Sequence, residues 1–235
     1  MRFAISPLLL LAPLAVLAVP VEITLGDDVT SNSIPTVKEA AVQARQLLRS
    51  ESIATLSTVF PEGEPHGLEG LPIGLMDYYA DCSENGNPTL LFVGVATSFK
   101  NAKAGAPISL SIREHSKSWS TASQPRVSLI GRLSSPVARN STEAERLKKC
   151  FVARHPDSRI WSPGNHIHNS DWVTFEVETI YWVGGFGNVA YIGFIPLDLY
   201  NSVTLEALDE SNGGLINTLQ KGWKKFRGLL GGAEL

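Results

Sequence analysis

The chain has 235 residues and a formal net charge of −3, and 43% of its residues are hydrophobic and 18% charged. These values are typical of a globular protein with a sizeable core, and the length predicts one domain with extensions. No basic cluster lies inside the predicted domain, so we exclude a nucleic-acid-binding surface and expect no nucleic-acid partner.

The N-terminus has the pattern of a secretory signal peptide. Arg2 supplies a positive charge, residues 5–17 form an apolar stretch short of a comfortable membrane span, and Ala18 ends a cleavage site of small residues. We therefore expect residues 1–18 to be removed and the protein to be secreted to the extracellular space or delivered to the endolysosomal lumen. Residues 19–34 are polar and non-periodic, which predicts a flexible lead-in.

A helix is predicted first, followed by strands. Thr36 and Glu39 form a capping box, and the apolar residues after them keep a helical period to about Ser50. The period then changes to two. Strands are predicted at residues 52–60, 67–80, 89–96, 108–113, 126–137, 171–183 and 188–195.

Two further helices are predicted between these strands. A short one follows the third strand, with Ser98 as its N-cap. A longer one begins with the capping box Thr142 and Glu145 and ends before Pro156, and His155 is expected to bond its last carbonyls. Six or seven strands with short helices between them predict a mainly β fold, a β-barrel.

A glycine motif near the C-terminus tests a different fold. Gly185-x-Gly187-x-x-Ala190 matches the dinucleotide-binding pattern, which must open a helix. The residues that follow are instead β-branched or aromatic and run to Pro196. We therefore interpret these glycines as a bend between strands and predict no dehydrogenase.

Three other patterns concern covalent and metal chemistry. Cys82 and Cys150 have no zinc spacing and can form one disulfide in an oxidising compartment, although the sequence does not establish that they meet. Asn140 opens an N-x-[ST] sequon and is the expected glycosylation site. His166 and His168 lack further nearby ligands, so no metal site is predicted.

Several segments together resemble a known family. The segments "ARQLLRSESIATLST" (44–58), "ARHPDSRIW" (153–161) and "DWVTFEVETIYWVGGFGNVAYI" (171–192) resemble the pyridoxamine 5′-phosphate oxidase-like split barrels. With the signal peptide, the sequon and "IPLDLYNSV" (195–203), the chain is most similar to the CREG family of secreted glycoproteins. The resemblance implies a six-stranded split β-barrel (the FMN-binding split-barrel type) over residues 35–205, assembled as a homodimer.

The resemblance also locates a candidate cofactor site. In flavin-binding relatives an S-R-K triplet grips the FMN phosphate, and Ser98-Phe99-Lys100 stands in its place here. Ser98 and Lys100 match, which makes them the candidate FMN contacts. The preceding strand, residues 67–80, has no arginine or lysine, although a phosphate dianion requires several charge-assisted donors. We therefore expect no cofactor.

The predicted function is a non-catalytic binding or interaction module for a protein or small-molecule ligand that the sequence does not identify. An FMN-dependent oxidoreductase and a haem-binding split barrel are the alternatives. Residues 206–235, outside the resemblance, have the pattern of a basic amphipathic helix, which could contact a membrane surface, although docking on the barrel or disorder is the favoured interpretation. The apolar stripe is Leu215, Leu219, Trp223, Phe226 and Leu230.

Overall fold

A computed structural model describes residues 34–115, 121–186 and 189–204. The chain divides into two compact units, Met1–Asn32 and Ser33–Leu235, and only the second contains described residues. The predicted signal peptide and the C-terminal tail therefore lie outside the described residues. Among the helices that are described, none combines the length and apolar character needed to cross a membrane.

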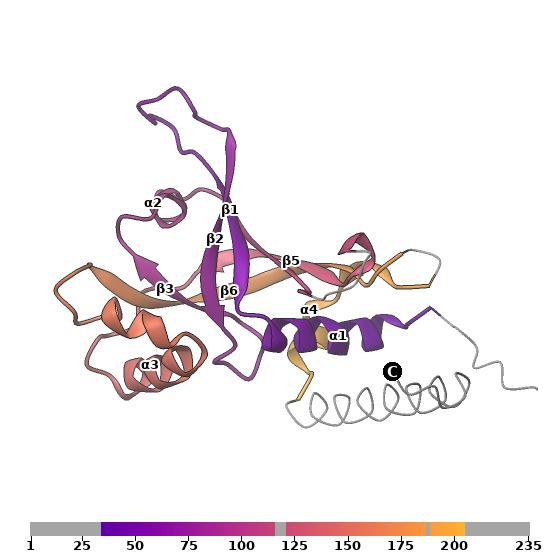
Figure 1. The fold of residues 1–235 in the computed structure, drawn as a ribbon. Helices are drawn as coiled ribbons and strands as arrows, with labels where there is room; N and C mark the ends of the chain where they lie inside the picture. The colour runs from indigo at the N-terminus through magenta and orange to yellow at the C-terminus, as the bar shows by residue number, and fades with distance from the viewer. Residues whose placement is uncertain (1–33, 116–120, 187–188, 205–235) are drawn as a thin grey trace, which may run out of the picture. The chain divides into compact units, whose positions relative to one another are not determined.

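The strands form a closed antiparallel barrel (Figure 1). They are β1 (Ile53–Val59), β2 (Pro72–Ala80), β3 (Thr89–Val93), β4 (Ile108–Arg113), β5 (Arg126–Leu133), β6 (Ser170–Val183) and β7 (Ile192–Ile195). Their order is β3-β2-β1-β4-β5-β6-β7, and an additional β3–β6 pairing closes the first six into a ring. The predicted six-stranded split barrel is confirmed.

The long strand β6 makes the closure possible. Its residues 170–174 pair with β3, and residues 175–183 pair with β5. The β5–β6 register shifts between Ile130 and Gly131, where a Cβ on Gly131 would lie 2.0 Å from the carbonyl oxygen of Glu176. Only glycine fits this bulge, which bends the barrel wall.

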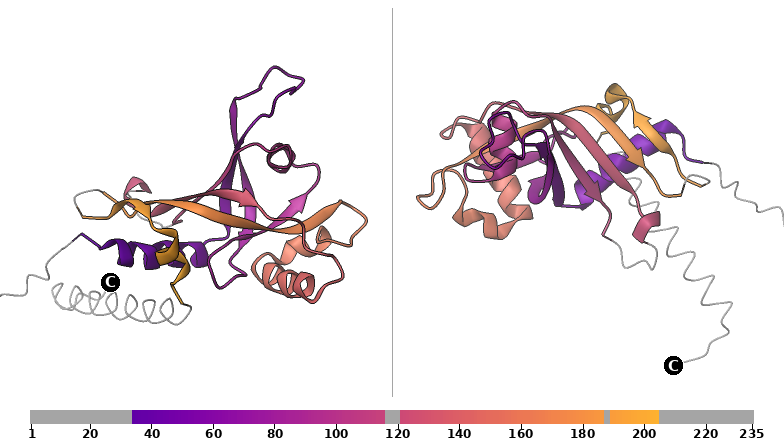
Figure 2. Two further views of the ribbon diagram at one scale, coloured as in Figure 1. Left: turned by 180° about the vertical axis from the view of Figure 1, so that it is seen from behind. Right: turned by 90° about the horizontal axis from the view of Figure 1, so that it is seen from above.

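Two helices lie near different ends of β6 (Figures 1 and 2). Helix α1 (Val37–Ser50) begins at the predicted capping box, in which Glu39 Oε2 accepts the Thr36 N–H at 2.7 Å. Its apolar face, including Ala40, Ala44 and Leu48, is buried against the barrel core. Helix α3 (Thr142–Arg154) covers the outer wall around Trp172 of β6. The shorter elements are α2 (Thr97–Lys103), α4 (Leu197–Asn201), η1 (Thr121–Ser123) and η2 (Pro156–Ile160).

The predicted N-cap of the short helix is wrong. The N-cap of α2 is Ala96, without a side-chain cap, and Ser98 lies inside the first turn. The helix starts early because the Ala96 N–H already bonds the Val93 carbonyl, which turns the chain directly out of β3.

The predicted caps of the longer helix also need correction. The N-cap of α3 is Ser141, not Thr142, because the turn from Ala138 places the Ser141 hydroxyl 3.1 Å from the N–H of Ala144. His155 is the C-cap residue, but its Nε2 bonds the carbonyl of Tyr79 on β2 at 2.9 Å instead of the last carbonyls of α3.

The glycine motif joins two strands. β6 ends at Val183 and β7 begins at Ile192, and the Gly184 N–H bonds the Tyr191 carbonyl across the connection at 3.0 Å. Gly184 and Gly185 therefore lie in the connection between two strands, as predicted, and Gly187 of the motif lies outside the described residues.

Candidate functional site

One outward row of side chains crosses six strands of the barrel wall. Successive partners in this row are Met76, Thr55, Ser111, Ser128, Tyr181 and Phe194. Their neighbours along the strands, such as Leu56, Leu110 and Leu129, are fully buried inside the barrel. Since side chains alternate between the faces of a strand, the row faces outward.

The row forms the floor of a shallow groove. Small hydroxyl residues occupy its middle, and large apolar residues occupy its ends, where Met76 is 79% and Phe194 62% exposed. A cavity of about 420 Å³ lies over the row and is also lined by Ile53 and Val183. We call this region the sheet-face groove.

One end of the sheet-face groove is polar and positively charged. Arg113 on β4 and Arg126 on β5 are register partners, so two guanidinium side chains lie next to each other. Arg126 Nη1 donates to the carbonyl of Ala122 at 3.0 Å. His115 lines the same end, and Glu51 accepts from its backbone N–H and contacts its Nδ1, both at 2.8 Å. This end can accept an anionic group next to apolar walls.

Sequence reasoning did not identify these groove residues as a site. The signal was present, because alternation in "ISLSIR" and "RVSLI" places Ser111 and Arg113, and Arg126 and Ser128, on one face of their strands. What was missing was the register between β4 and β5, which brings the two pairs together.

The hydroxyl groups in the middle of the sheet-face groove lie close together. Ser111 and Ser128 contact each other through their hydroxyl oxygens at 3.4 Å. The described residues also contain no group of three or more His, Cys, Asp or Glu side chains that could hold a metal ion.

The residues predicted to contact FMN lie elsewhere. Ser98 is 2% exposed in α2, Lys100 of the same helix is exposed, and neither lines the sheet-face groove. A hydroxyl buried in this way does not fit an FMN phosphate approaching from solvent. FMN contact by this pair stays a prediction.

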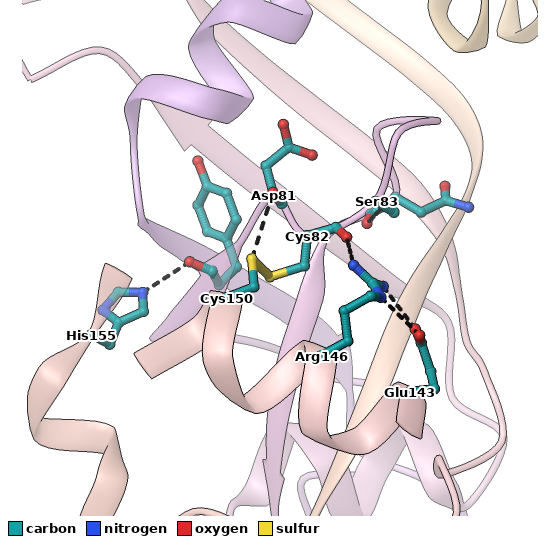
Figure 3. The surroundings of a disulfide bond; sticks show 9 residues. Asp81, Cys82, Ser83, Glu143, Arg146, Cys150 and His155 are labelled. Carbon is teal, nitrogen blue, oxygen red and sulfur yellow. Dashed lines mark hydrogen bonds and ion pairs between the residues drawn. A yellow bond between two sulfur atoms is a disulfide. The ribbon is translucent and has the colours of Figure 1, made fainter. Parts of the chain in front are cut away.

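The two cysteines form a disulfide (Figure 3). It joins Cys82, just after β2, to Cys150 on α3. Arg146 reinforces the same connection, because its Nη1 donates to the Cys82 carbonyl at 2.6 Å while its other nitrogens bond Glu143 at 2.7 and 2.8 Å. The disulfide is consistent with an oxidising compartment.

The predicted glycosylation site lies at the start of the same helix. Asn140 is exposed in the turn directly before the N-cap Ser141. Glycan attachment at Asn140 stays a prediction.

Two carboxyl groups near the barrel interior have perturbed protonation. Burial raises the pKa of Asp77 to about 6, although its carboxylate accepts the N–H of Tyr78 at 2.8 Å. Burial also raises the pKa of Asp81, and the positive charges of Arg45 and Arg49 oppose this rise.

The comparison with known families agrees with this geometry. Residues 35–202 match the CREG β-barrel family. The chain belongs to the CREG β-barrel family. A comparison with curated proteins finds no match.

Solved structures share the fold of this CREG-family chain at low sequence identity. A heme binding protein from Mycobacterium smegmatis has a TM-score of 0.57 and 20% identity, with 72% of this chain and 61% of that chain covered. ChuZ from Campylobacter jejuni has a TM-score of 0.52 and 16% identity, with 67% and 60% covered. A protein of unknown function from Agrobacterium tumefaciens has a TM-score of 0.50 and 20% identity, with 63% and 57% covered. The chain thus spans about three fifths of each of these three.

Proposed function

We propose that this CREG-family chain is a secreted glycoprotein that acts as a non-catalytic binding module and assembles as a homodimer through the sheet-face groove. The observation that carries the proposal is the exposure of large apolar side chains on this face. Those more than a third exposed on its strands are Ile53, Met76, Ile130, Tyr181, Ile192 and Phe194. Large apolar side chains exposed at both ends of one face are typical of an interaction site.

The shape and chemistry of the groove support a second copy as its cover. The outward row has hydroxyls in its middle and Met76, Tyr181 and Phe194 at its ends, and a second copy can pack on this face about a two-fold axis. The rings of Tyr181 and Phe194 already lie edge to face with their centroids 5.1 Å apart. These side chains therefore lose little conformational freedom when a second copy binds.

The homodimer is tested by light scattering on matched charge insertions. Met76→Asp places a carboxylate in the groove, and Ile160→Asp places one on η2, where Ile160 is 58% exposed and outside the groove. We expect a dimeric mass for the wild type and Ile160→Asp and a monomeric mass for Met76→Asp. A monomeric wild type, or a dimer that Met76→Asp leaves unchanged, contradicts the proposal.

Secretion and glycosylation are supported by the disulfide and by the exposed turn at Asn140. We expect the secreted protein to begin after Ala18 and to lose mass on treatment with a peptide N-glycosidase. Asn140→Gln should abolish that loss. A protein that retains residues 1–18, or an Asn140→Gln variant that still loses mass, contradicts this part.

An anionic cofactor, FMN or haem, is the second candidate ligand, and the adjacent arginines Arg113 and Arg126 favour it. The absorbance spectrum of the purified protein, before and after adding FMN or haem, separates the two functions. We expect no stoichiometric chromophore. Stoichiometric flavin bands, or a Soret band lost on replacing one histidine, would overturn the cofactor-free function.

A further inference from the structure

The last described element is held in place beside α1. Tyr200 of α4 is fully buried, and its hydroxyl donates to the carbonyl of Gly86 at 3.1 Å. The buried Arg45 of α1 lies with its guanidinium 5.3 Å from the Tyr200 ring centroid and donates to the Tyr200 carbonyl at 3.4 Å. Residues 205–235 therefore start from a defined point next to α1.

A second cavity lies beside α1. Its volume is about 610 Å³. Its apolar lining is Leu47 of α1, Pro125 and Trp182, and its charged lining includes both Arg49 and the acidic residues Glu51 and Glu114. We call it the α1 groove.

One polar atom at the α1 groove lacks a partner. Trp182 is fully buried, and within the described part of the chain its indole Nε1 has no hydrogen-bond acceptor. A Cβ on Gly184 would lie 2.8 Å from this nitrogen, so only a glycine lets the backbone pass this close to the N–H edge of the ring. A buried donor without a partner is costly, which points to a group that supplies an acceptor.

The chain itself contains a segment that matches this groove. The apolar stripe Leu215 to Leu230 is about 24 Å long as a helix at about 1.5 Å per residue, and the 14-residue α1 is about 21 Å long by the same measure. The segment is also basic, through Lys221, Lys224, Lys225 and Arg227, and the groove is lined by two carboxylates, Glu51 and Glu114, and one guanidinium, Arg49. An amphipathic stripe in water requires an apolar cover.

We propose that residues 205–235 fold back on their own barrel and dock in the α1 groove through this stripe. The residues between Thr204 and Leu215 span about 35 Å when extended, which is ample for a segment that starts beside α1. The docked segment brings acceptors to Trp182 Nε1 and places its cations near Glu51 and Glu114. The occupant is a part of the same chain, whereas the sheet-face groove is proposed to bind a second copy, and His115 lines both cavities.

The test compares two charge insertions in the full chain. Leu219→Asp places a carboxylate in the stripe, and Asn217→Asp places one on the opposite side of the same helix. The first readout is the rate of trypsin cleavage between Lys221 and Arg227. The second is the ¹H–¹⁵N resonance of the Trp182 indole, assigned through Trp182→Phe.

We expect Leu219→Asp to raise the cleavage rate about tenfold or more, because undocking exposes the cleavage sites, and to shift the Trp182 indole resonance, because undocking changes the surroundings of the indole N–H. Asn217→Asp should change neither. The proposal is overturned if wild-type cleavage is as fast as that of a free peptide of residues 205–235, or if the two variants behave alike. It is also overturned if the wild type binds phosphatidylserine vesicles, Leu219→Asp abolishes that binding, and the Trp182 resonance does not move.

Discussion

The outward side chains of this barrel are buried near the beginning of β6 and exposed near its end. At the beginning of the strand, Trp172 is 2% exposed beneath α3, together with the buried Leu147 and Phe151. Near its end, Tyr181 is 38% exposed and Phe194 on β7 is 62% exposed. The same kind of apolar wall is thus covered within the chain at one end and left uncovered by the described elements at the other. Covered wall stabilises the fold, and uncovered wall is available for recognition.

The largest expected effect on stability comes from removing the disulfide at the covered end of β6. The disulfide closes a loop with a sequence separation of 68 residues. Replacing Cys82 and Cys150 by serine should lower the free energy of unfolding by about 4 kcal/mol, mainly because the unfolded chain regains entropy. Urea unfolding measures this. A loss below about 1 kcal/mol would show that α3 is held by packing and hydrogen bonds alone.

A substitution in β2 tests whether a buried carboxyl group sets the pH dependence of the free energy of unfolding. Since the folded pKa of Asp77 is about 6, above its usual value of 3.8, the folded state binds the proton more tightly than the unfolded state. The ionised carboxyl destabilises the fold above pH 6, and stability rises as pH falls from about 6 to 4. Asp77 is only partly buried, so the effect on stability is smaller than the full pKa shift implies. We expect Asp77→Asn to raise the free energy of unfolding by about 2 kcal/mol at pH 7.

The control for this prediction is the pH profile itself. The side-chain amide that Asp77→Asn introduces cannot ionise and keeps an oxygen that can accept the Tyr78 N–H, so the gain should vanish near pH 4. Urea unfolding at pH 4, 5.5 and 7 provides the comparison. A gain that is equal at all three pH values would show that Asp77 acts through packing and not through its charge.

The smallest effect concerns the uncovered end. Met76→Thr removes an apolar side chain that is 79% exposed, so it should change the free energy of unfolding of the monomer by less than about 0.5 kcal/mol. Urea unfolding at protein concentrations low enough to keep the chain monomeric measures this. A cost near that of a core substitution would mean that Met76 packs inside the fold, and the contrast between the two ends would fail.

Local patterns predicted much of the fold. The capping box of Thr36 and Glu39 begins α1, and alternation makes Ile108, Leu110 and Ile112 the inward, buried residues of β4. These features depend on neighbours in sequence. The N-caps were harder, because tight turns from Val93 and from Ala138 decide where α2 and α3 begin.

The site depended on contacts between distant residues. Arg113 and Arg126 become neighbours only through the β4–β5 register, and Cys82 meets Cys150 only because α3 packs beside the end of β2. No local period encodes either contact. A local motif also failed to predict the placement of Ser98. This residue matches a phosphate-binding triplet in sequence but is buried in α2.

Thiol labelling tests most directly whether the sheet-face groove is covered in solution. The described cysteines are both in the disulfide, so Met76→Cys and Ile160→Cys each introduce one reactive thiol at a position that is exposed in the single chain. If the groove is an interface, Met76→Cys should label about tenfold or more slowly than Ile160→Cys at high protein concentration, and dilution should remove the difference. Equal labelling rates at all concentrations would contradict the account.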